Sequence, residues 1–251
     1  DHYVPQPDRD AGSRTMWQFV QAFLRHGYAV KFWPDNLNRD PVYAPMLQQI
    51  GVEVVYGKEH EGRFGEWIGQ NGGEIDVVLL SRPHVAVEYL EAVRGSSRAR
   101  VLYYGHDIHY LRMDEQLKLQ PDDALLRVDR DKAQRQERHL WERVDSVYYP
   151  SEDETRVVRA WLDRHAPKVH ARTVPAYAYP EPPSRPGANL AARSGIVFVA
   201  GFGHPPNVDA AEWLGREALP QVRARHPGAA LSLVGSNPSD RVMALRGDGI
   251  E

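Results

Sequence analysis

The segment GIVFVAGFGHPPNVDAAEWL, residues 195–214, carries the clearest fold signal in this 251-residue chain. Residues 196–200 form a continuous apolar run rich in β-branched and aromatic side chains, which predicts a strand buried on both faces. Glycines follow at 201 and 203, where they permit a tight turn and let a ligand approach the backbone closely. The segment therefore begins as a buried strand that ends in a glycine turn.

The residues after this turn predict a helix start that suits an anion. His204-Pro205-Pro206 is incompatible with a helix through the turn, so Asn207 is the expected N-cap, and apolar residues continue beyond it at helical spacing. A helix N-terminus presents free N–H groups and the positive end of the helix dipole to an anion such as a phosphate. Many turns of this kind bind nothing, so a purely structural role stays open from the pattern alone.

Composition excludes several kinds of function. The net charge is −3 with 26% charged residues, so no basic excess favours a nucleic-acid partner. Cysteine is absent, which excludes disulfides, cysteine-ligated metals and a thiol nucleophile. No apolar run approaches the ~20 residues of a membrane span, and no signal peptide is found. We therefore expect a cytoplasmic protein.

Strands and helices alternate along the rest of the chain, which is typical of βαβ units with a parallel sheet. The expected strands before residue 178 span 28–33, 52–56, 75–80, 101–104, 146–149 and 169–174. A long charged helix is expected over 121–144. Residues 1–5 resemble the end of a further strand and residues 249–251 the start of one, so we expect a fragment of a longer protein.

A proline-rich segment divides the chain into two predicted domains. Residues 180–186 contain four prolines, which cannot join a sheet or a helix, so 179–194 is expected to be an extended linker. It separates a complete Rossmann-like domain, 1–178, from the beginning of a second Rossmann-like domain, 195–251. The predicted fold class is α/β.

Ligands of open parallel sheets bind beyond the carboxyl ends of the strands, so polar residues there are candidate site residues. Gly12 and Ser13 open a helix in a loop whose N–H groups suit an anion, although the loop has neither dinucleotide-binding nor P-loop spacing. A polar turn that only caps the helix is an equal alternative. Cations that could face a phosphate or an acidic acceptor, or be plain surface charges, are Arg14, Arg82 and Arg112.

The sequence His106-Asp107-Ile108-His109 is the sharpest cluster of candidate catalytic residues. One imidazole could hydrogen-bond a sugar hydroxyl or the reacting centre, with Asp107 fixing its tautomer. A structural role for either histidine, bonded to a backbone carbonyl, is the alternative. These residues are too few for a metal site and no further ligand appears at suitable spacing, so no metal is expected.

Two segments resemble one known family. The run at 195–213, together with Leu219-Pro220 and the sequence LVGSNP at 233–238, resembles the start of the second domain of GT-B glycosyltransferases of family 4, which build bacterial surface polysaccharides. The cluster at 106–109 matches the strand-end His or Asp that lies beside the donor sugar in that family. The resemblance implies a GT-B-like retaining transferase that needs no cofactor. It would move a sugar from a nucleotide-sugar to a glycan or lipid-linked acceptor, the latter at the inner face of the membrane.

The resemblance also implies roles for individual residues. Donor-binding roles fall to residues of the glycine turns, namely Gly12, Ser13, Gly201, Gly203, His204, Asn207, Gly235 and Ser236. Catalytic roles fall to His106, Asp107 and His109, and contacts to acceptor or phosphate fall to Arg14, Arg82 and Arg112. His204 stands where many relatives carry Arg or Lys, and a neutral imidazole is a weaker anion partner. The family's paired glutamates would lie beyond Glu251, so residues 1–251 alone are not expected to turn over.

Two other functions stay open at this point. A GT-B sugar-nucleotide epimerase would share the architecture without transferring a sugar, and a non-catalytic α/β module would bind a ligand in the cleft between the domains. A dehydrogenase is disfavoured because its glycine fingerprint is absent.

Overall fold

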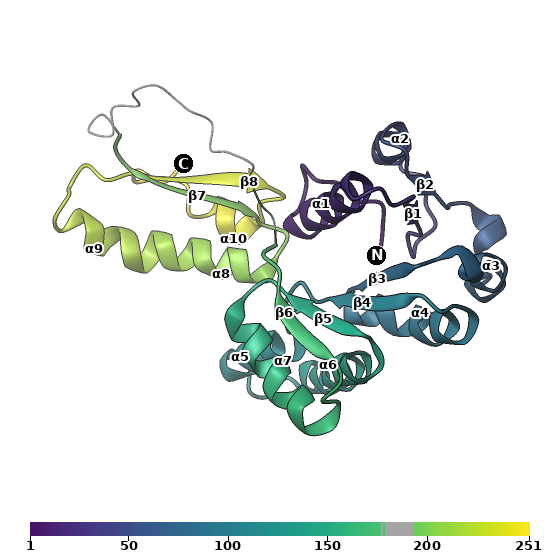
Figure 1. Cartoon of the computed structure of the whole chain (residues 1–251). Coiled ribbons are helices and arrows are strands. Elements are labelled where there is room, and N and C mark those ends of the chain that lie inside the picture. Colours follow the sequence, from purple (N-terminus) through teal and green to yellow (C-terminus); the bar gives the residue numbers. More distant parts are fainter. Residues whose placement is uncertain (177, 179–192) are drawn as a thin grey trace. The chain divides into compact units, whose positions relative to one another are not determined.

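The computed structural model describes residues 1–176, 178 and 193–251. It is an α/β structure with parallel sheets, so the predicted fold class is confirmed at that level (Figure 1). The chain divides into two compact units, Asp1–Tyr179 and Pro180–Glu251. Apart from residues 193 and 194, the expected linker at 179–194 lies outside the described residues.

The first unit contains a four-stranded parallel sheet in the order β3-β4-β5-β6. Its strands are β3 (Val77–Ser81), β4 (Arg100–Tyr104), β5 (Ser146–Tyr149) and β6 (His170–Thr173). Each overlaps a strand that the apolar runs predict. The register pairs Val77 with Arg100, Leu102 with Ser146, and Ser146 with His170, which aligns the carboxyl ends of the strands at one edge of the sheet.

A second, two-stranded parallel sheet lies earlier in the chain. It pairs β1 (Lys31–Phe32) with β2 (Glu53–Val54), so these strands are shorter than expected. Residues 1–5, expected to end a strand, form none. The expectation is wrong for these residues because they pair by only two backbone bonds, from Asp35 N to Asp1 O (2.8 Å) and from Asn36 N to His2 O (3.0 Å).

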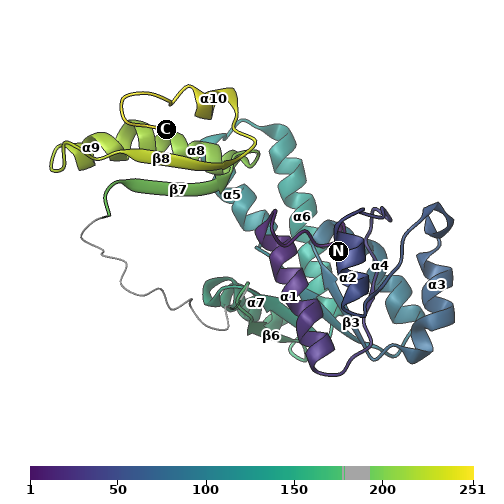
Figure 2. The same ribbon diagram turned by 90° about the horizontal axis from the view of Figure 1, so that it is seen from above.

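Helices connect the strands and cover both faces of the four-stranded sheet. They are α1 (Ala11–Arg25), α2 (Tyr43–Gln49), α3 (Phe64–Asn71), α4 (Pro83–Ser96), α5 (His109–Leu119), α6 (Ala124–Arg143) and α7 (Glu152–His165), with short 3₁₀ turns at Lys58–His60 and Gly72–Glu74. In Figure 1, α4, α6 and α7 lie below the sheet and α1 lies above it, and Figure 2 shows α1 crossing the sheet. Phe19 of α1 meets Tyr104 of β4 at 4.9 Å between ring centroids.

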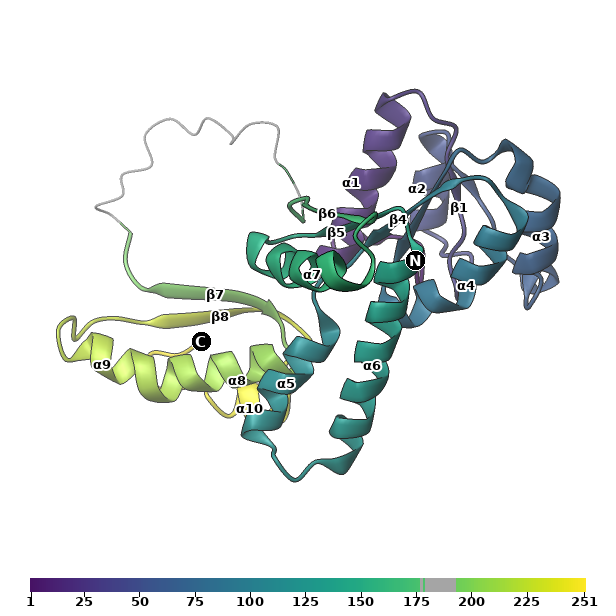
Figure 3. The ribbon, with the colours of Figure 1, turned by 60° about the horizontal axis from the view of Figure 1, so that its bottom comes forward.

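Helix α5 is an element that the apolar pattern does not predict. Its residues are mostly polar and give only a weak apolar stripe, yet α5 pairs with α6 as a helical hairpin (Figure 3). The helix expected over 121–144 is α6, which places Leu140 and Trp141 in the main core. No helix in the described part of the chain is both long and apolar enough to cross a membrane.

The second unit consists of two parallel strands with helices packed against one face. The strands are β7 (Ile196–Gly201) and β8 (Leu231–Ser236), and the helices are α8 (Pro205–Trp213), a π-helical turn at Leu214–Ala218, α9 (Leu219–Arg223) and α10 (Asp240–Met243). Phe202, Val208 and Val242 belong to its core. Ile250 forms a parallel bridge with Leu231, beside β8.

The prediction that the strand at 196–200 is buried on both faces is wrong. Val197 is 65% exposed and Val199 is 71% exposed, and Val234 of the neighbouring strand lies open as well. Phe198 and Ala200 alternate with these valines and pack against the core on the other face. Among the described residues of this unit, only that second face is covered by helices, so one face of the apolar run stays in solvent.

Candidate functional site

The N-terminus of α1 and the carboxyl ends of β3 and β4 bring predicted site residues together. A Cβ atom placed on Gly12 would lie 3.0 Å from Arg82 Nη2, 3.3 Å from Asp10 Oδ1 and 3.5 Å from His106 Cε1. Gly12 therefore sits between a guanidinium and an imidazole, where any side chain would intrude. We call the following residues the strand-end cluster: Asp10, Gly12, Ser13, Ser81, Arg82 and His106.

His106 is held as a neutral imidazole in this cluster. Its Nε2 lies 2.9 Å from Ser81 Oγ, and its ring meets Tyr104 edge-on at 5.3 Å between centroids. Burial and, next, the nearby charge of Arg82 lower the pKa of His106 to about 4. At neutral pH its ring thus offers one hydrogen-bond donor and one acceptor.

Arg82 occupies a strained backbone position at the end of β3. Its φ of 64° and ψ of 120° are unusual for a residue with a side chain, and Pro83 follows at the first position of α4. Such a conformation costs about 1–3 kcal/mol and is tolerated where the surroundings impose it, often at functional sites. Arg82 Nε donates to Asp1 Oδ1 at 2.6 Å, and the guanidinium lies 5.6 Å from the centre of the Tyr3 ring.

The remaining predicted catalytic residues form a separate group. Asp107 accepts a hydrogen bond from Arg112 Nε at 2.6 Å, and its other oxygen lies 3.0 Å from His109 Nε2. Burial opposes ionisation of Asp107, but hydrogen bonds and charge from His109 and Arg112 outweigh it and hold its pKa well below the usual range. Asp107 therefore orients His109 rather than His106, and it is a carboxylate at neutral pH.

Carboxylates already occupy the helix N-termini beside these groups. Asp10 caps α1 by accepting from Ser13 N at 2.8 Å and from Ser13 Oγ at 2.7 Å. At the start of α5, Glu137 accepts from His109 N at 3.0 Å and from Tyr110 N at 3.2 Å, and Glu154 accepts from Ile108 N at 3.1 Å. The expected anion site at 12–14 therefore competes with a carboxylate of the chain itself.

Glu137 is not predicted from the sequence, because this residue reaches α5 from the middle of α6. It is fully buried, at 0% exposure, and only the fold brings it to His109 and Tyr110. Glu154 stands three residues after Ser151, the spacing of a capping box at the start of α7. Its N–H does donate to Ser151 Oγ at 3.2 Å, but its carboxylate also bonds the Ile108 N–H of the candidate site.

We expect Glu137 to make folding stability depend on pH. Burial raises its pKa from 4.5 to about 7, so the folded chain retains a proton that the unfolded chain releases. Its contribution is complete below pH 4.5 and is lost as pH rises through 7, a fall of roughly 3 kcal/mol. Urea unfolding at pH 5 and pH 8 should show this fall in the native chain and not in Glu137→Gln. Glu142→Gln, an exposed position on the same helix, is the control, and equal profiles for Glu137→Gln and the native chain would contradict the prediction.

The glycine turns of the second unit also lie side by side. Gly201 pairs with Ser236 in the parallel register, and a Cβ on Gly203 would lie 3.8 Å from Asn237 Cβ. Gly235 faces the backbone of the neighbouring strand, where a Cβ would lie 1.7 Å from Ala200 O. Gly201, Gly203, Gly235 and Ser236 are therefore brought together, and packing alone requires a glycine at 235.

The predicted helix cap at Asn207 is wrong. Helix α8 begins at Pro205 with His204 as its N-cap, because prolines are tolerated in a first turn whose N–H groups need no helical partner. The two prolines have no N–H, and the N–H groups of Asn207 and Val208 both donate to His204 O, at 3.0 and 3.4 Å. The Asn207 side chain donates to Gly201 O at 2.9 Å. These four positions therefore leave no free N–H for an anion.

Arg14 lies on α1, and its Nη1 donates to Pro7 O at 3.4 Å. Across the residues that the structure describes, no group of three or more His, Asp or Glu side chains is arranged to hold a metal ion.

Fold and site together define an α/β protein with parallel sheets whose candidate site residues lie at the carboxyl ends of strands. A comparison with known protein families found no model that matches the chain, and a comparison with curated proteins found no matching sequence.

Proposed function

We propose that this chain belongs to a GT-B-type glycosyltransferase that moves a sugar, with retention, from a nucleotide-sugar to a glycan or lipid-linked acceptor in polysaccharide biosynthesis. The observation that supports it most is the strand-end cluster, in which a neutral imidazole and a guanidinium flank the side-chain-free Gly12. A sugar ring can approach the backbone at Gly12 while a polar ligand meets both side chains.

In this proposal His106 makes the contact with the reacting sugar. A neutral imidazole that is partly shielded from water forms directional hydrogen bonds with hydroxyl groups without attracting the phosphates itself. Ser81, 2.9 Å from Nε2, fixes the ring orientation. Asp107 and His109 are positioning residues, because the strongly ionised Asp107 is paired with both Arg112 and His109 and is a poor proton donor.

The charge of a departing diphosphate is met by side chains in this scheme. The start of α8 has two prolines and the starts of α1 and α5 are capped by carboxylates, so free backbone N–H groups play a smaller part than the resemblance implies. Arg82 is the cation nearest Gly12 among the described residues around that glycine. Fixed cations that face developing negative charge are an effective form of transition-state stabilisation.

Calorimetry with UDP-, GDP- and dTDP-sugars on the native polypeptide tests this proposal. One donor should bind, and Arg82→Gln should weaken that binding at least about tenfold, the loss of one charge-assisted contact. Arg156→Gln, on an exposed arginine of α7 that pairs with Asp153, should leave binding unchanged.

Failure of all the nucleotide-sugars to bind or to be hydrolysed would rule out the transferase. Conversion of a nucleotide-sugar to its epimer would identify the epimerase instead. Binding without turnover in the native polypeptide would identify a non-catalytic module.

A further inference from the structure

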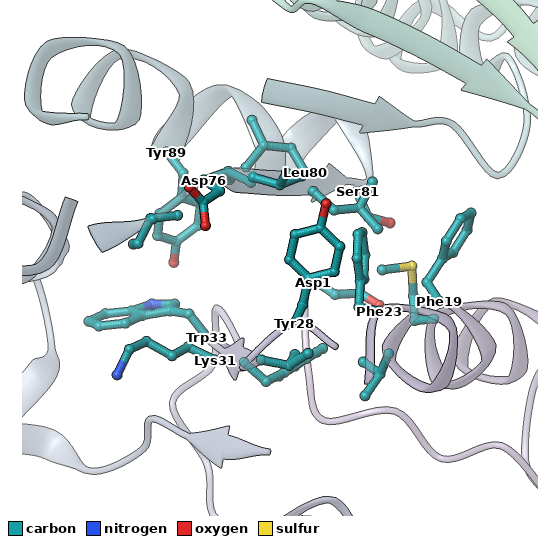
Figure 4. Close-up of a pocket in the computed structure, with 18 of the residues that line it drawn as sticks. Asp1, Phe19, Phe23, Tyr28, Lys31, Trp33, Asp76, Leu80, Ser81 and Tyr89 are labelled. Carbon is teal, nitrogen blue, oxygen red and sulfur yellow. The ribbon is translucent and has the colours of Figure 1, made fainter. Parts of the chain in front are cut away.

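The two sheets of the first unit are separated by a cavity of about 550 Å³. Residues 28–33, around β1, and residues 75–81, around β3, are among those that line it. Neither strand pairs with the other, although each is parallel to its own partner. Figure 4 shows Phe23, Trp33, Leu80 and Tyr89 around this space.

Both strands direct unpaired backbone groups into the cavity. Val30 O and Phe32 O accept from Glu53 N and Val55 N at 2.9 Å each, so residues 30 and 32 face β2. Backbone groups alternate along a strand in a parallel ladder, so those of Lys31 and Trp33 face the cavity. Asp76 O accepts from Arg100 N at 2.8 Å, which by the same alternation turns Val77 and Leu79 toward the cavity.

The side chains around the cavity are apolar on both faces. Helix α1 supplies Met16 and Phe19 on one face, while α3 and α4 supply Ile68 and Val85 on the other. Met16, Ile68 and Val85 are almost fully buried. A chain segment in this space would be covered on both sides, as a central strand of a parallel sheet is.

The direction of the occupant follows from Asp1, which lines the same cavity. Asp1 O accepts from Asp35 N just after β1, and its carboxylate accepts from Arg82 Nε just after β3. Asp1 thus lies at the carboxyl ends of both strands. A segment leading into Asp1 would run through the cavity parallel to β1 and β3.

We propose that the cavity is the seat of a strand formed by residues of the native polypeptide that precede Asp1. This strand joins the two sheets into one, in the order β2-β1-new strand-β3-β4-β5-β6. Matching the five residues of β3, it has about five residues at ~3.3 Å each, with a nearly continuous apolar sequence. The two open strand edges, each with backbone groups directed into the cavity, are the observation that carries this inference.

Backbone hydrogen exchange compares the native polypeptide with residues 1–251. The amides of Val77 and Leu79 should exchange at least about 100-fold more slowly in the native polypeptide, because only there do they have strand partners. The amides of Val78 and Leu80 are matched controls, since they face β4 and should be protected equally in both chains. This readout needs no nucleotide-sugar, so it is independent of the proposed activity.

A disulfide test covers the case in which residues 1–251 do not fold alone. The sequence has no cysteine, so Leu79→Cys can be paired with single cysteines scanned along the residues before Asp1 of the native polypeptide. Cross-links should form at a few positions spaced two residues apart. A native polypeptide without preceding residues, an absence of cross-links, equal exchange of Val77 and Leu79 in two folded chains, or a small apolar molecule found in the cavity would each overturn the inference.

Discussion

Gly235→Ala is expected to unfold the second unit of the chain. The new Cβ would lie 1.7 Å from Ala200 O and 3.2 Å from the ring of Phe202, so β7 and β8 could no longer pair at this point. Overpacking against side chains costs about 1–3 kcal/mol, and a clash with backbone should exceed that range. Thermal unfolding followed through Trp213, the tryptophan of this unit, measures the effect.

Gly201→Ala is the matched control for this substitution. Gly201 stands at the end of the partner strand, and a Cβ there would have no atom within 4 Å, so stability should change by less than about 0.5 kcal/mol. A Gly235→Ala chain that keeps its stability and loses only donor affinity would contradict the packing role and restore the donor-binding role.

Under the proposed transferase function, His106→Ala is expected to lower kcat/KM for the best nucleotide-sugar by about 10²–10⁴, the usual range for removing a side chain that acts at the reacting centre. Under the proposed function, the native polypeptide should lose activity on the acid side as pH falls through about 4, where His106 becomes charged. Because its folded pKa lies below the ordinary 6.5, the stability that His106 contributes is present above pH 6.5 and is lost as pH falls through 4.

Two variants separate catalysis from folding at this position. Ser81→Ala removes the hydrogen-bond partner of Nε2 and should lower the rate less than His106→Ala while moving the acid limb of the pH profile. His165→Ala, on α7 against Trp161, should leave the rate unchanged. If His106→Ala loses stability and activity to the same extent, the imidazole is structural.

The four strands of the larger sheet are predicted well, because the signal for each strand lies within its own residues. The apolar run at 101–104 and its glycine stop define β4, and Gly12, Arg82 and His106 are found because parallel strands end at one edge. Helix α5 and Glu137 are not found, because the helix depends on carboxylates contributed by α6 and α7. The strain at Arg82 is equally invisible, since neighbouring elements impose it.

The start of α8 is predicted at the wrong residue for a different reason. Prolines at 205 and 206 predict that no helix passes through these residues. Prolines are equally suited to the first turn of a helix, which is where they lie in α8. Which of the two occurs depends on where the backbone turns. Val197 and Val199 of β7 are exposed because helices cover only the other face of that sheet. An apolar run in the sequence does not show how many faces of a sheet are covered.

The carboxylate of Glu137 links the middle of α6 to the backbone at the start of α5. It belongs to α6, on the opposite side of the sheet from α1, and it holds the backbone that follows His106 and Asp107 (Figure 1). Substitutions that shift α6 along its axis are therefore expected to move the backbone of His109 and Tyr110, just after His106. In directed evolution of this chain, substitutions in α6 are therefore a way to change the surroundings of His106 from outside the strand-end cluster.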